Sequence, residues 1–363
     1  MLVVANPGKR LDAFLAACSE LRRRAPRVIH HAALLESPAL LDALPDELDV
    51  RIDSFGRDEA VERTLLELGR APDGIEPRAR ARGEMVAPAQ IQRGWLRQLQ
   101  RIDAHWKGRW TTWNARWALG ELFDKPRVST RLRHADIRVP DALDPPESVE
   151  ALRASVRDAG WPSVFVKLAC GSSAVGIARW DLERGDVVTT VEREGDRWYN
   201  TRRLVHLRER AAIDGVLELI VRQGAHVERA IELARLDGKR FDLRVLVIAG
   251  EPAFVVARTS AHPMTNLHLG GRRAALERVR ASVPAAQWEE AMSLAVRCAG
   301  LYECFHLGVD IGFEAGTFTP YVFEANAFGD FFPGLTRDGL SVMAWELRAR
   351  ASVIRHCAAH DAE

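Results

Sequence analysis

Two short segments near the end of the chain bring two acidic side chains opposite each other. Residues 308–312 (GVDIG) and 323–326 (FEAN) have the composition of short strands, and residues 314–318 (EAGTF) between them are typical of a chain reversal. A hairpin that turns there sets Asp310 opposite Glu324 in neighbouring strands. The sequence therefore predicts a two-stranded unit with a pair of facing carboxylates.

Facing carboxylates about 5 Å apart are destabilising unless a positive charge lies between them. Asn326, two residues beyond Glu324, points its amide oxygen from the same face of the strand. Oxygen ligands without a nearby His or Cys fit Mg²⁺, with Mn²⁺ as the alternative. Asp310, Glu324 and Asn326 are therefore the candidate metal ligands. The simpler alternative is that both acids form ion pairs with arginines.

The composition limits the partners of this chain. Its 363 residues are enough for two or three domains, and its 51 basic and 50 acidic side chains nearly cancel. Because no global field results, we expect neither nucleic acid nor a membrane surface as a partner. Five cysteines form no C-x-x-C pair, and their odd number argues against a disulfide framework. Without a signal-peptide pattern or a membrane-spanning apolar run, the sequence predicts a soluble cytoplasmic protein.

Strand and helix patterns alternate in the first part of the chain. The expected elements, in chain order, are a strand at residues 2–5, a helix at 11–21, strands at 28–29 and 50–52, and a helix at 59–68. This alternation is typical of a small parallel α/β domain. The turn at residues 6–9 has a single glycine and lacks both the P-loop and the G-x-G-x-x-G pattern, so we expect a nucleotide to bind elsewhere.

Four tryptophans follow one another at three- and four-residue spacing, at positions 106, 110, 113 and 117. The first of them also shares a predicted helical face with Ile91, Leu99 and Ile102. The preferred interpretation is a helical stripe docked against a core. A stacking platform for a base or a sugar is the alternative.

Two lysines stand at element boundaries beside a small-residue loop. Lys125 precedes a predicted helix at residues 127–134, and Lys167 follows a predicted strand at residues 163–166. The loop at residues 170–176 (CGSSAVG) comes directly afterwards. Small residues let backbone N–H groups approach phosphate oxygens, and a lysine at the strand end adds positive charge. The loop is therefore a candidate phosphate-binding loop, and an ordinary hairpin connection is the alternative.

Three further strands are predicted, at residues 218–223, 241–248 and 253–258. In the hairpin formed by the last two, Arg244 and Arg258 oppose each other if the loop has three residues and do not if it has two. Two arginines that converge near the acid pair would destabilise an ordinary apolar core. Around a phosphoryl group, they would instead stabilise its negative charge. The next loop has a Gly pair that allows close backbone approach, and it presents Asn266 to a substrate.

The order of these parts resembles the ATP-grasp superfamily, most closely the branch that contains glutathione synthetase and the RimK-type glutamate ligases. The resemblance covers about residues 122–335. It rests on Asp124-Lys125, residues 137–140 (IRVP), Lys167 with the Gly-Ser-Ser loop, residues 242–244 (DLR), residues 266–271 (NLHLGG), Val309-Asp310 and residues 323–326 (FEAN). The family implies a fold of mixed α/β and α+β class, in which a small parallel α/β N-terminal domain precedes two α+β subdomains that sandwich ATP. The corresponding boundaries are 1–121, 122–217 and 218–363.

The resemblance also implies a role for each candidate residue. Two lysines would hold the nucleotide phosphates, a loop would fold over them, a hinge after a strand would contact adenine, and an acid would bind the ribose. In that order, the residues are Lys125 and Lys167; Gly171, Ser172, Ser173 and Gly176; Arg222 and Gln223; and Glu228. The acid pair and Asn326 would hold magnesium. After this asparagine the branch usually has a small residue and Pro-Gly, whereas this chain reads AFGDFFPG.

The implied activity is an ATP-dependent carboxylate–amine ligase that forms an amide through an acyl phosphate, on a small molecule or a peptide. Arg244, Arg258 and Asn266 would be its catalytic residues, because the reaction needs positioning and charge stabilisation rather than a protein nucleophile. Two alternatives stay open: a kinase that phosphorylates a hydroxyl, and a nucleotide-binding scaffold without turnover. A homodimer is a further expectation from the family.

Overall fold

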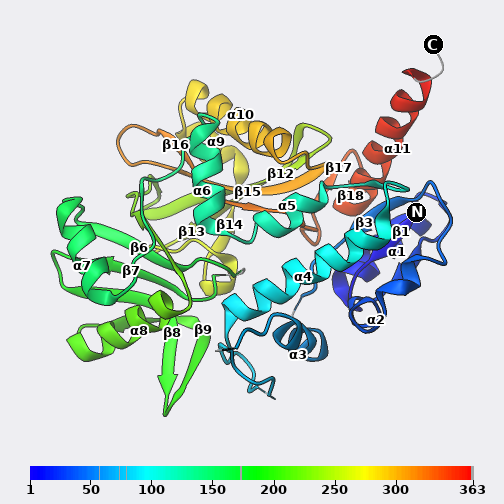
Figure 1. Cartoon of the computed structure of the whole chain (residues 1–363). Helices are drawn as coiled ribbons and strands as arrows, with labels where there is room; N and C mark the ends of the chain where they lie inside the picture. The colour runs from blue at the N-terminus through cyan, green and yellow to red at the C-terminus, as the bar shows by residue number, and fades with distance from the viewer. Residues whose placement is uncertain (57, 73, 79, 172–173, 361–363) are drawn as a thin grey trace.

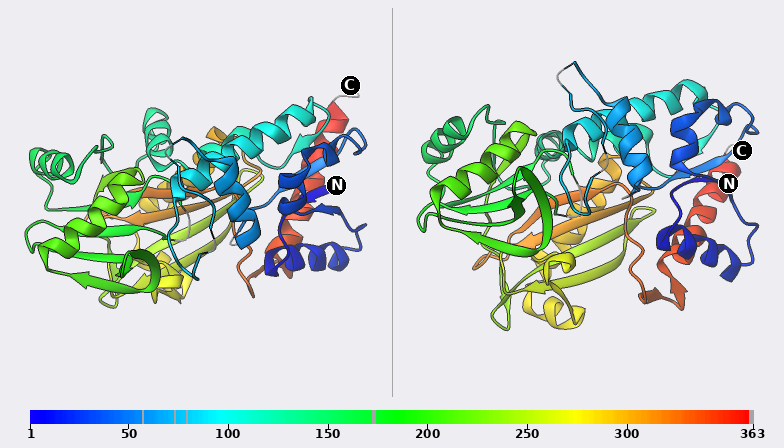
Figure 2. Two further views of the ribbon diagram at one scale, coloured as in Figure 1. Left: turned by 60° about the horizontal axis from the view of Figure 1, so that its bottom comes forward. Right: turned by 90° about the horizontal axis from the view of Figure 1, so that it is seen from below.

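The computed structural model describes residues 1–56, 58–72, 74–78, 80–171 and 174–360 (Figure 1). Within these residues the chain forms a four-stranded sheet, two six-stranded sheets and a two-stranded unit. The N-terminal elements and the last helix lie together at one end of the molecule, and the middle sheet lies at the other end (Figure 2). Within the described residues, no helix is both long enough and apolar enough to cross a bilayer.

The N-terminal sheet has the strand order β2-β1-β3-β4, with all strands parallel. Its strands are β1 (Leu2–Val4), β2 (Arg27–Ile29), β3 (Asp49–Ile52) and β4 (Thr111–Thr112). Between them lie α1 (Lys9–Glu20), α2 (His31–Glu36), the 3₁₀ helix η1 (Pro38–Leu41) and α3 (Glu59–Leu68). The predicted parallel α/β unit is confirmed. Its helix α3 begins where the Asp58 carboxylate accepts hydrogen bonds from the backbone N–H groups of Ala60 and Val61.

The tryptophan-rich segment does not form one helix. The long helix α4 (Pro88–Trp106) ends just before Gly108, whose φ of 72° is left-handed and stops helical propagation. The next two tryptophans lie in the connection to α5 (Arg116–Glu121), and Trp117 belongs to α5 itself. The predicted single helical stripe is therefore wrong. The first three tryptophans are still buried, whereas Trp117 is 41% exposed.

The middle sheet is antiparallel, with the order β5-β10-β6-β7-β8-β9. Its strands are β5 (Ala142–Leu143), β6 (Ser163–Leu168), β7 (Ile177–Asp181), β8 (Asp186–Glu194), β9 (Arg197–Leu207) and β10 (Ala225–Arg229). Helix α6 (Lys125–His134) precedes the sheet, and α7 (Val149–Asp158) and α8 (Arg210–Arg222) share one apolar core with it.

One sequence prediction in this region is wrong: residues 218–223 are not a strand. They form the last turns of α8 and its C-cap, Gln223. The buried positions of α8 are Ile213, Val216, Leu217, Ile220 and Val221, which recur at helical spacing. The β-branched run at its end favours a strand locally, but the apolar face of the whole helix decides the fold. The strand that follows is β10, which begins at Ala225.

The C-terminal sheet is also antiparallel, with the order β14-β13-β12-β15-β16 and β11 paired to β12. Its strands are β11 (Arg235–Leu236), β12 (Lys239–Ile248), β13 (Glu251–Ser260), β14 (Arg272–Ala274), β15 (His306–Phe313) and β16 (Pro320–Asn326). The remaining helices of this part are η2 (Leu267–Leu269), α9 (Leu276–Ser282) and α10 (Ala285–Leu301). Apolar side chains of α10 share the main core with this sheet.

The last helix packs against the N-terminal α/β unit. After the small hairpin β17 (Thr336–Arg337) and β18 (Leu340–Ser341), helix α11 (Val342–His360) returns to α1 (Figure 1). Met343 and Leu347 of α11 are buried in one core with Val3 of β1 and Phe14 of α1. The first strand and the last helix are therefore parts of one packing unit.

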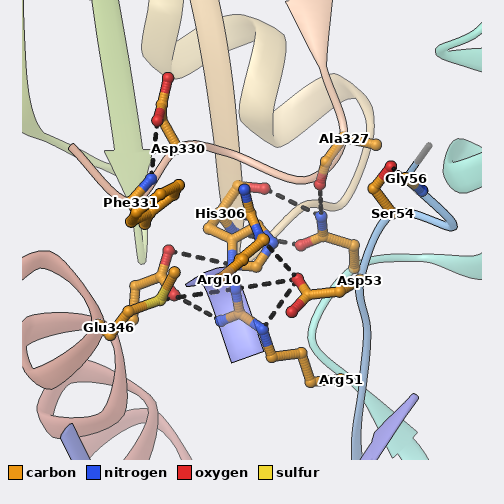
Figure 3. A network of polar contacts seen from close by, with 12 residues as sticks. Arg10, Arg51, Asp53, Ser54, Gly56, His306, Ala327, Asp330, Phe331 and Glu346 are labelled. Atoms are coloured by element: carbon orange, nitrogen blue, oxygen red, sulfur yellow. Dashed lines mark hydrogen bonds and ion pairs between the residues drawn. The ribbon is translucent and has the colours of Figure 1, made fainter. Parts of the chain in front are cut away.

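Buried charges join this unit to the C-terminal sheet (Figure 3). Arg51 of β3 is fully buried and pairs with Asp53 and with Glu346 of α11. His306 at the start of β15 has its Nδ1 3.3 Å from Oε1 of the same glutamate. Burial would raise the pKa of Glu346, but its partners Arg51 and His306 lower it to about 2. Burial lowers the pKa of His306 itself, which favours its neutral form. The Arg51–Glu346 ion pair therefore joins β3 to α11, and the His306 ring of β15 packs beside it.

Candidate active site

A row of charged side chains crosses one face of the C-terminal sheet. The strand pairing places Asp242 opposite Arg258, Arg244 opposite Asp310, and Asp310 opposite Glu324. The predicted hairpin and its facing acid pair are thus confirmed. Four neighbouring strands, β13, β12, β15 and β16, each contribute at least one charged group to this row.

The two arginines converge, although they do not oppose each other. The β12–β13 loop has two residues, Ala249 and Gly250, and the register shifts by one residue between Val247 and Leu246, so Arg244 lies opposite Val256. Nevertheless, Arg244 Nη1 lies 2.8 Å and Arg258 Nη2 lies 3.1 Å from the same oxygen, Oδ1 of Asp310. Arg258 also donates from Nε to Asp242 Oδ1 at 2.8 Å. One carboxylate therefore receives both guanidinium groups.

Two members of this row are held in their charged forms by their neighbours. Burial would raise the pKa of Asp310, but Arg244 and Arg258 hold it below its usual value. For Arg258, burial would lower the pKa, and Asp242 and Asp310 more than offset this effect, so its pKa is raised. The Asp310 carboxylate and the Arg258 guanidinium are therefore a stable pair of opposite charges.

Glycines on both sides of Asp310 make room for its neighbours. A Cβ atom at Gly308 would lie 3.1 Å from Nε of Arg244, and a Cβ at Gly312 would lie 2.2 Å from the ring of Phe323. The G-x-D-x-G pattern therefore reflects close approach across the strands.

Two lysines from outside the C-terminal sheet lie near this row, one at the start of α6 and one in β6 of the middle sheet. Lys125 is the first residue of α6, after its N-cap Asp124; its Nζ donates to the Gly171 carbonyl at 2.6 Å and lies 3.7 Å from Glu324 Oε1. Lys167 forms a buried ion pair with Glu228, which also contacts His226 at 3.1 Å. Burial would raise the pKa of Glu228, but Lys167 and His226 lower it to about 2. The Lys167 ammonium group is therefore oriented by an acid, and that of Lys125 by the Gly171 carbonyl.

These groups line one cavity of about 100 Å³, which we call the inner cavity, between the middle and C-terminal sheets. The predicted site residues that it brings together are Lys125, Lys167, Gly171, Glu228, Arg258, Asn266, Asp310 and Glu324. Arg244 adjoins it through Asp310. Ser172 and Ser173 lie outside the described residues. Gly176 is at the end of the same loop, where its backbone N–H donates to Asn200 Oδ1 at 3.1 Å.

Arg222 and Gln223 are not among the residues that line the inner cavity. Their assignment assumed that a strand ends there, but they end α8. The strand that follows them is β10, and Glu228 and Arg229 of this strand, with Ile231 just beyond it, line the cavity. The strand end that the sequence placed at residues 222–223 therefore lies at Arg229.

Sequence reasoning also missed the apolar walls of this cavity. They are Phe165, Val175, Ile177, Ile231, Leu233, Met264 and Phe323. One signal was present, because Phe165 precedes Lys167 by two residues and therefore faces the same side of β6. The walls contributed by the loops between strands have no comparable signal.

The donor set fits a hard cation. Asp310 and Glu324 offer carboxylate oxygens on paired strands, and Asn326, which pairs with Gly308, offers an amide oxygen. The Nδ2 atom of Asn326 is buried and has no hydrogen-bond partner within the described residues. No group of three His, Cys, Asp or Glu side chains suitable for a metal occurs within the described ranges. Two carboxylates and an amide are nevertheless enough for Mg²⁺, which keeps several water ligands.

Solved structures share this architecture at low sequence identity. The chain is similar to the ATP-grasp ligase PsnB complexed with minimal precursor (TM-score 0.52, 16% identity, 97% of this chain and 98% of that chain). It is also similar to the D-cycloserine synthetase DcsG (TM-score 0.58, 12% identity, 96% and 99%). A third is the macrocyclase MdnC bound with precursor peptide MdnA from Microcystis aeruginosa MRC (TM-score 0.53, 8% identity, 96% and 99%). At these identities the likeness shows the fold.

A search of the curated proteins finds no match. A family model described as YheC/D-like ATP-grasp matches residues 145–330, which is 186 of the 363 residues. The matched range includes the charged row, Lys167 and the whole of both large sheets except β5. The chain therefore belongs to the YheC/D-like ATP-grasp family.

Proposed function

We propose that the protein is an ATP- and Mg²⁺-dependent carboxylate–amine ligase that forms an amide through an acyl phosphate. The observation that carries this proposal is the lining of the inner cavity, where Lys125, Lys167 and Arg258 meet the facing acids Asp310 and Glu324. Cations for phosphate oxygens and oxygen ligands for a hard cation thus share one space. A magnesium nucleotide requires this combination.

In this proposal the nucleotide occupies the inner cavity. Lys125 and Lys167 bind its phosphates, and the loop from Gly171 to Gly176, with Ser172 and Ser173, folds over them. Apolar side chains such as Phe165 and Ile231 take the base. Glu228 belongs to the nucleotide site through Lys167, whose ammonium group it orients.

Asp310, Glu324 and Asn326 would hold the metal, Mg²⁺ or alternatively Mn²⁺. When bound, the cation neutralises phosphate charge and so favours transfer of the terminal phosphoryl group. Lys125, 3.7 Å from Glu324, would stand between the acid and the phosphates.

The reaction we propose has two steps. A substrate carboxylate oxygen attacks the γ-phosphorus, the bond to the β,γ-bridging oxygen breaks, and ADP leaves an acyl phosphate behind. An amine nitrogen then attacks the acyl carbon, phosphate leaves, and the amine proton passes to solvent. Arg244 and Arg258 stabilise the negative charge on the transferring group, and Asn266 orients the acceptor.

Two observations support a ligase within this family. The similar structures include an ATP-grasp ligase, a synthetase and a macrocyclase. The set of cations and acids is complete, which argues against a scaffold without turnover. The motifs also support a relationship to the RimK and glutathione synthetase branch and a division at residues 1–121, 122–217 and 218–363, and we retain these as proposals. The homodimer stays an expectation from the family.

The test uses purified protein with ATP and MgCl₂ and pools of carboxylates, amines and peptides, with ADP, phosphate and product mass as readouts. We expect ADP release that depends on an added pair, and a product lighter by one water than the sum of that pair. Lys125→Met should remove this turnover, whereas Lys239→Met, at an exposed position of β12, should keep it.

Other outcomes would overturn the ligase assignment in distinct ways. A stable phosphorylated product would make the protein a kinase at the same site. ATP binding without ADP formation across all pools would favour the scaffold. Equal turnover in Lys125→Met and the unaltered protein would remove the inner cavity from the mechanism.

A further inference from the structure

A second cavity, which we call the outer cavity, adjoins the inner one. It measures about 980 Å³ and lies between the N-terminal helices α3 and α4 and strand β9 of the middle sheet. The two cavities share Gly171 and Val175 of the β6–β7 loop. Because the nucleotide is assigned to the inner cavity, this larger space is available to the carboxylate or amine substrate of the proposed reaction.

The floor of the outer cavity is aromatic. Phe55 lies between Trp95 and Phe123, with ring centroids 5.1 Å and 5.8 Å away. The row continues from Phe123 to Phe328, again at 5.8 Å. Phe328 stands two residues after the candidate ligand Asn326. A row of aromatic side chains therefore leads from the outer cavity towards the end of β16, the strand that carries Glu324 and Asn326.

The rim is made by two backbone segments that meet and then separate. Residues 80–88 approach β9, where the Met85 N–H donates to the Trp198 carbonyl and the Asn200 N–H donates to the Gly83 carbonyl, both at 2.8 Å. Directly beyond this contact, residues 201–204 of β9 lie opposite the single residue Thr190 of β8. Such a bulge turns side chains out of the sheet, and here Thr201 and Arg202 line the cavity. Figure 1 shows the segment before α4 beside β9.

Charges of both signs remain available on this rim. Glu62 and Glu84 are already paired with arginines. In contrast, Glu59, Arg82 and Arg202 have no ion-pair partner within the described part of the chain, and all three are exposed. A ligand suited to this cavity has an apolar body and charged groups of both signs.

The size of the cavity favours a ligand longer than one amino acid. Its volume is nearly ten times that of the inner cavity, which it adjoins at Gly171 and Val175. A short peptide therefore has room in the outer cavity while one end of it reaches towards the inner one. A fatty chain would leave the rim charges unmatched, and a second nucleotide would face acidic as well as basic groups.

We propose that the outer cavity binds a short peptide segment, with at least one bulky apolar side chain over the aromatic floor, as the substrate that reacts at the inner cavity. This inference rests on the proposed ligase function. It adds the class of the substrate and the surface that selects it.

The test fills the cavity from one of its walls. Gln92 of α4 lines the outer cavity, whereas Gln100 lies on the same helix, is exposed and is not part of the lining. Gln92→Trp and Gln100→Trp are therefore a matched pair. Each protein is saturated with a non-hydrolysable ATP analogue and Mg²⁺ and mixed with tetrapeptides that together carry all amino acids at each position. Retained peptides are identified by ultrafiltration and mass spectrometry.

We expect the unaltered protein and Gln100→Trp to retain tetrapeptides with bulky apolar side chains, and to retain no free amino acid from a parallel mixture. Gln92→Trp should weaken binding of the best peptide by roughly tenfold or more. A charge-reversal pair, Arg202→Glu against its exposed neighbour Arg203→Glu, repeats the test without changing α4. Arg202→Glu should change which peptides are retained, and Arg203→Glu should not.

The proposal is overturned if no tetrapeptide is retained, if free amino acids bind equally well, or if both matched pairs behave like the unaltered protein. Binding of the ATP analogue is measured in the same samples. Nucleotide binding without peptide retention would sink this inference and leave the ligase proposal standing. Peptide retention without nucleotide binding would do the reverse.

Discussion

Arg244 and Asp310 face each other across β12 and β15, with Nη1 of the arginine 2.8 Å from Oδ1 of the aspartate. Arg258 reaches the same oxygen from β13. The acid that we assign to the metal is therefore paired with two guanidinium groups in the protein alone. A cation bound there has to share Asp310 with the arginines, which links metal binding to the position of the groups that would meet the phosphate.

Removal of Arg244 and removal of Arg258 should have different effects on stability and on ATP turnover. Arg258 forms a buried pair with Asp242, with side chains 8% and 4% exposed. Arg258→Ala leaves that acid buried without its partner, and we expect a loss of about 3–5 kcal/mol in the free energy of unfolding. Arg244→Ala leaves Asp310 with Arg258, so we expect a smaller loss of stability and a fall in ATP turnover of roughly 100-fold or more.

Urea unfolding and ADP release on both variants check this contrast. Arg203→Ala, at an exposed position of β9, serves as the control for removal of an arginine. Equal loss of stability in Arg244→Ala and Arg258→Ala would contradict the different anchoring of the two side chains.

Glu324→Ala should abolish turnover while the fold survives. The Glu324 side chain is 28% exposed and is paired only loosely, with Lys125 Nζ at 3.7 Å, so its removal costs little stability. As a metal ligand, it should affect the rate by roughly 100-fold or more. ADP release at increasing MgCl₂ measures this effect, with Glu290→Ala on the surface of α10 as the control. An unchanged rate and magnesium dependence would remove Glu324 from the metal site.

The Glu228–Lys167 pair should make the middle sheet sensitive to acid. The pKa of Glu228 is lowered in the folded protein to about 2, from an ordinary value of 4.5. Its contribution to stability is therefore fully present above pH 4.5 and is lost as the pH falls towards 2. Glu228→Gln should be less stable than the unaltered protein at pH 6 and should lose less stability between pH 4.5 and 3. Thermal melts across this pH range measure the effect. If the melting temperatures of both proteins fall equally between pH 4.5 and 3, the assignment is refuted.

Gly312→Ala should strain the site, because the added Cβ would lie 2.2 Å from the Phe323 ring and 2.6 Å from Leu233. Both neighbours line the inner cavity, so we expect a loss of about 1–3 kcal/mol in stability and weaker nucleotide binding. The double variant Gly312→Ala with Phe323→Leu removes the closest contact and should recover part of both. If the second change gives no recovery in melting temperature or nucleotide affinity, the ring is not the cause.

The local parts of the site were predictable from the sequence. The pairing of Asp310 with Glu324 depends on one short hairpin, and the position of Lys125 depends on one helix start, so turn and capping signals were enough. The strand predicted at residues 218–223 was wrong for a related reason. A short β-branched run looked like a strand, while the apolar face that makes it helical extends back to Ile213.

The parts that depend on distant contacts were not predictable. Arg244 and Arg258 converge although the loop rule alone separates them, because Asp310, which belongs to a third strand, receives both. The outer cavity is formed by segments near residues 55, 82, 123 and 202. A sequence pattern describes each of these segments but not the space between them.

The return of α11 to β1 also sets the order in which the protein is completed on the ribosome. Arg51 and its partner Glu346 are separated by 295 residues. At translation rates of about 5–20 residues per second, roughly 15 to 60 s pass between the synthesis of one and the other. During that interval the N-terminal sheet lacks α11, which supplies part of its core, while the strands of the two other sheets have already been synthesised. The core of the N-terminal sheet is therefore closed only after α11 has been synthesised.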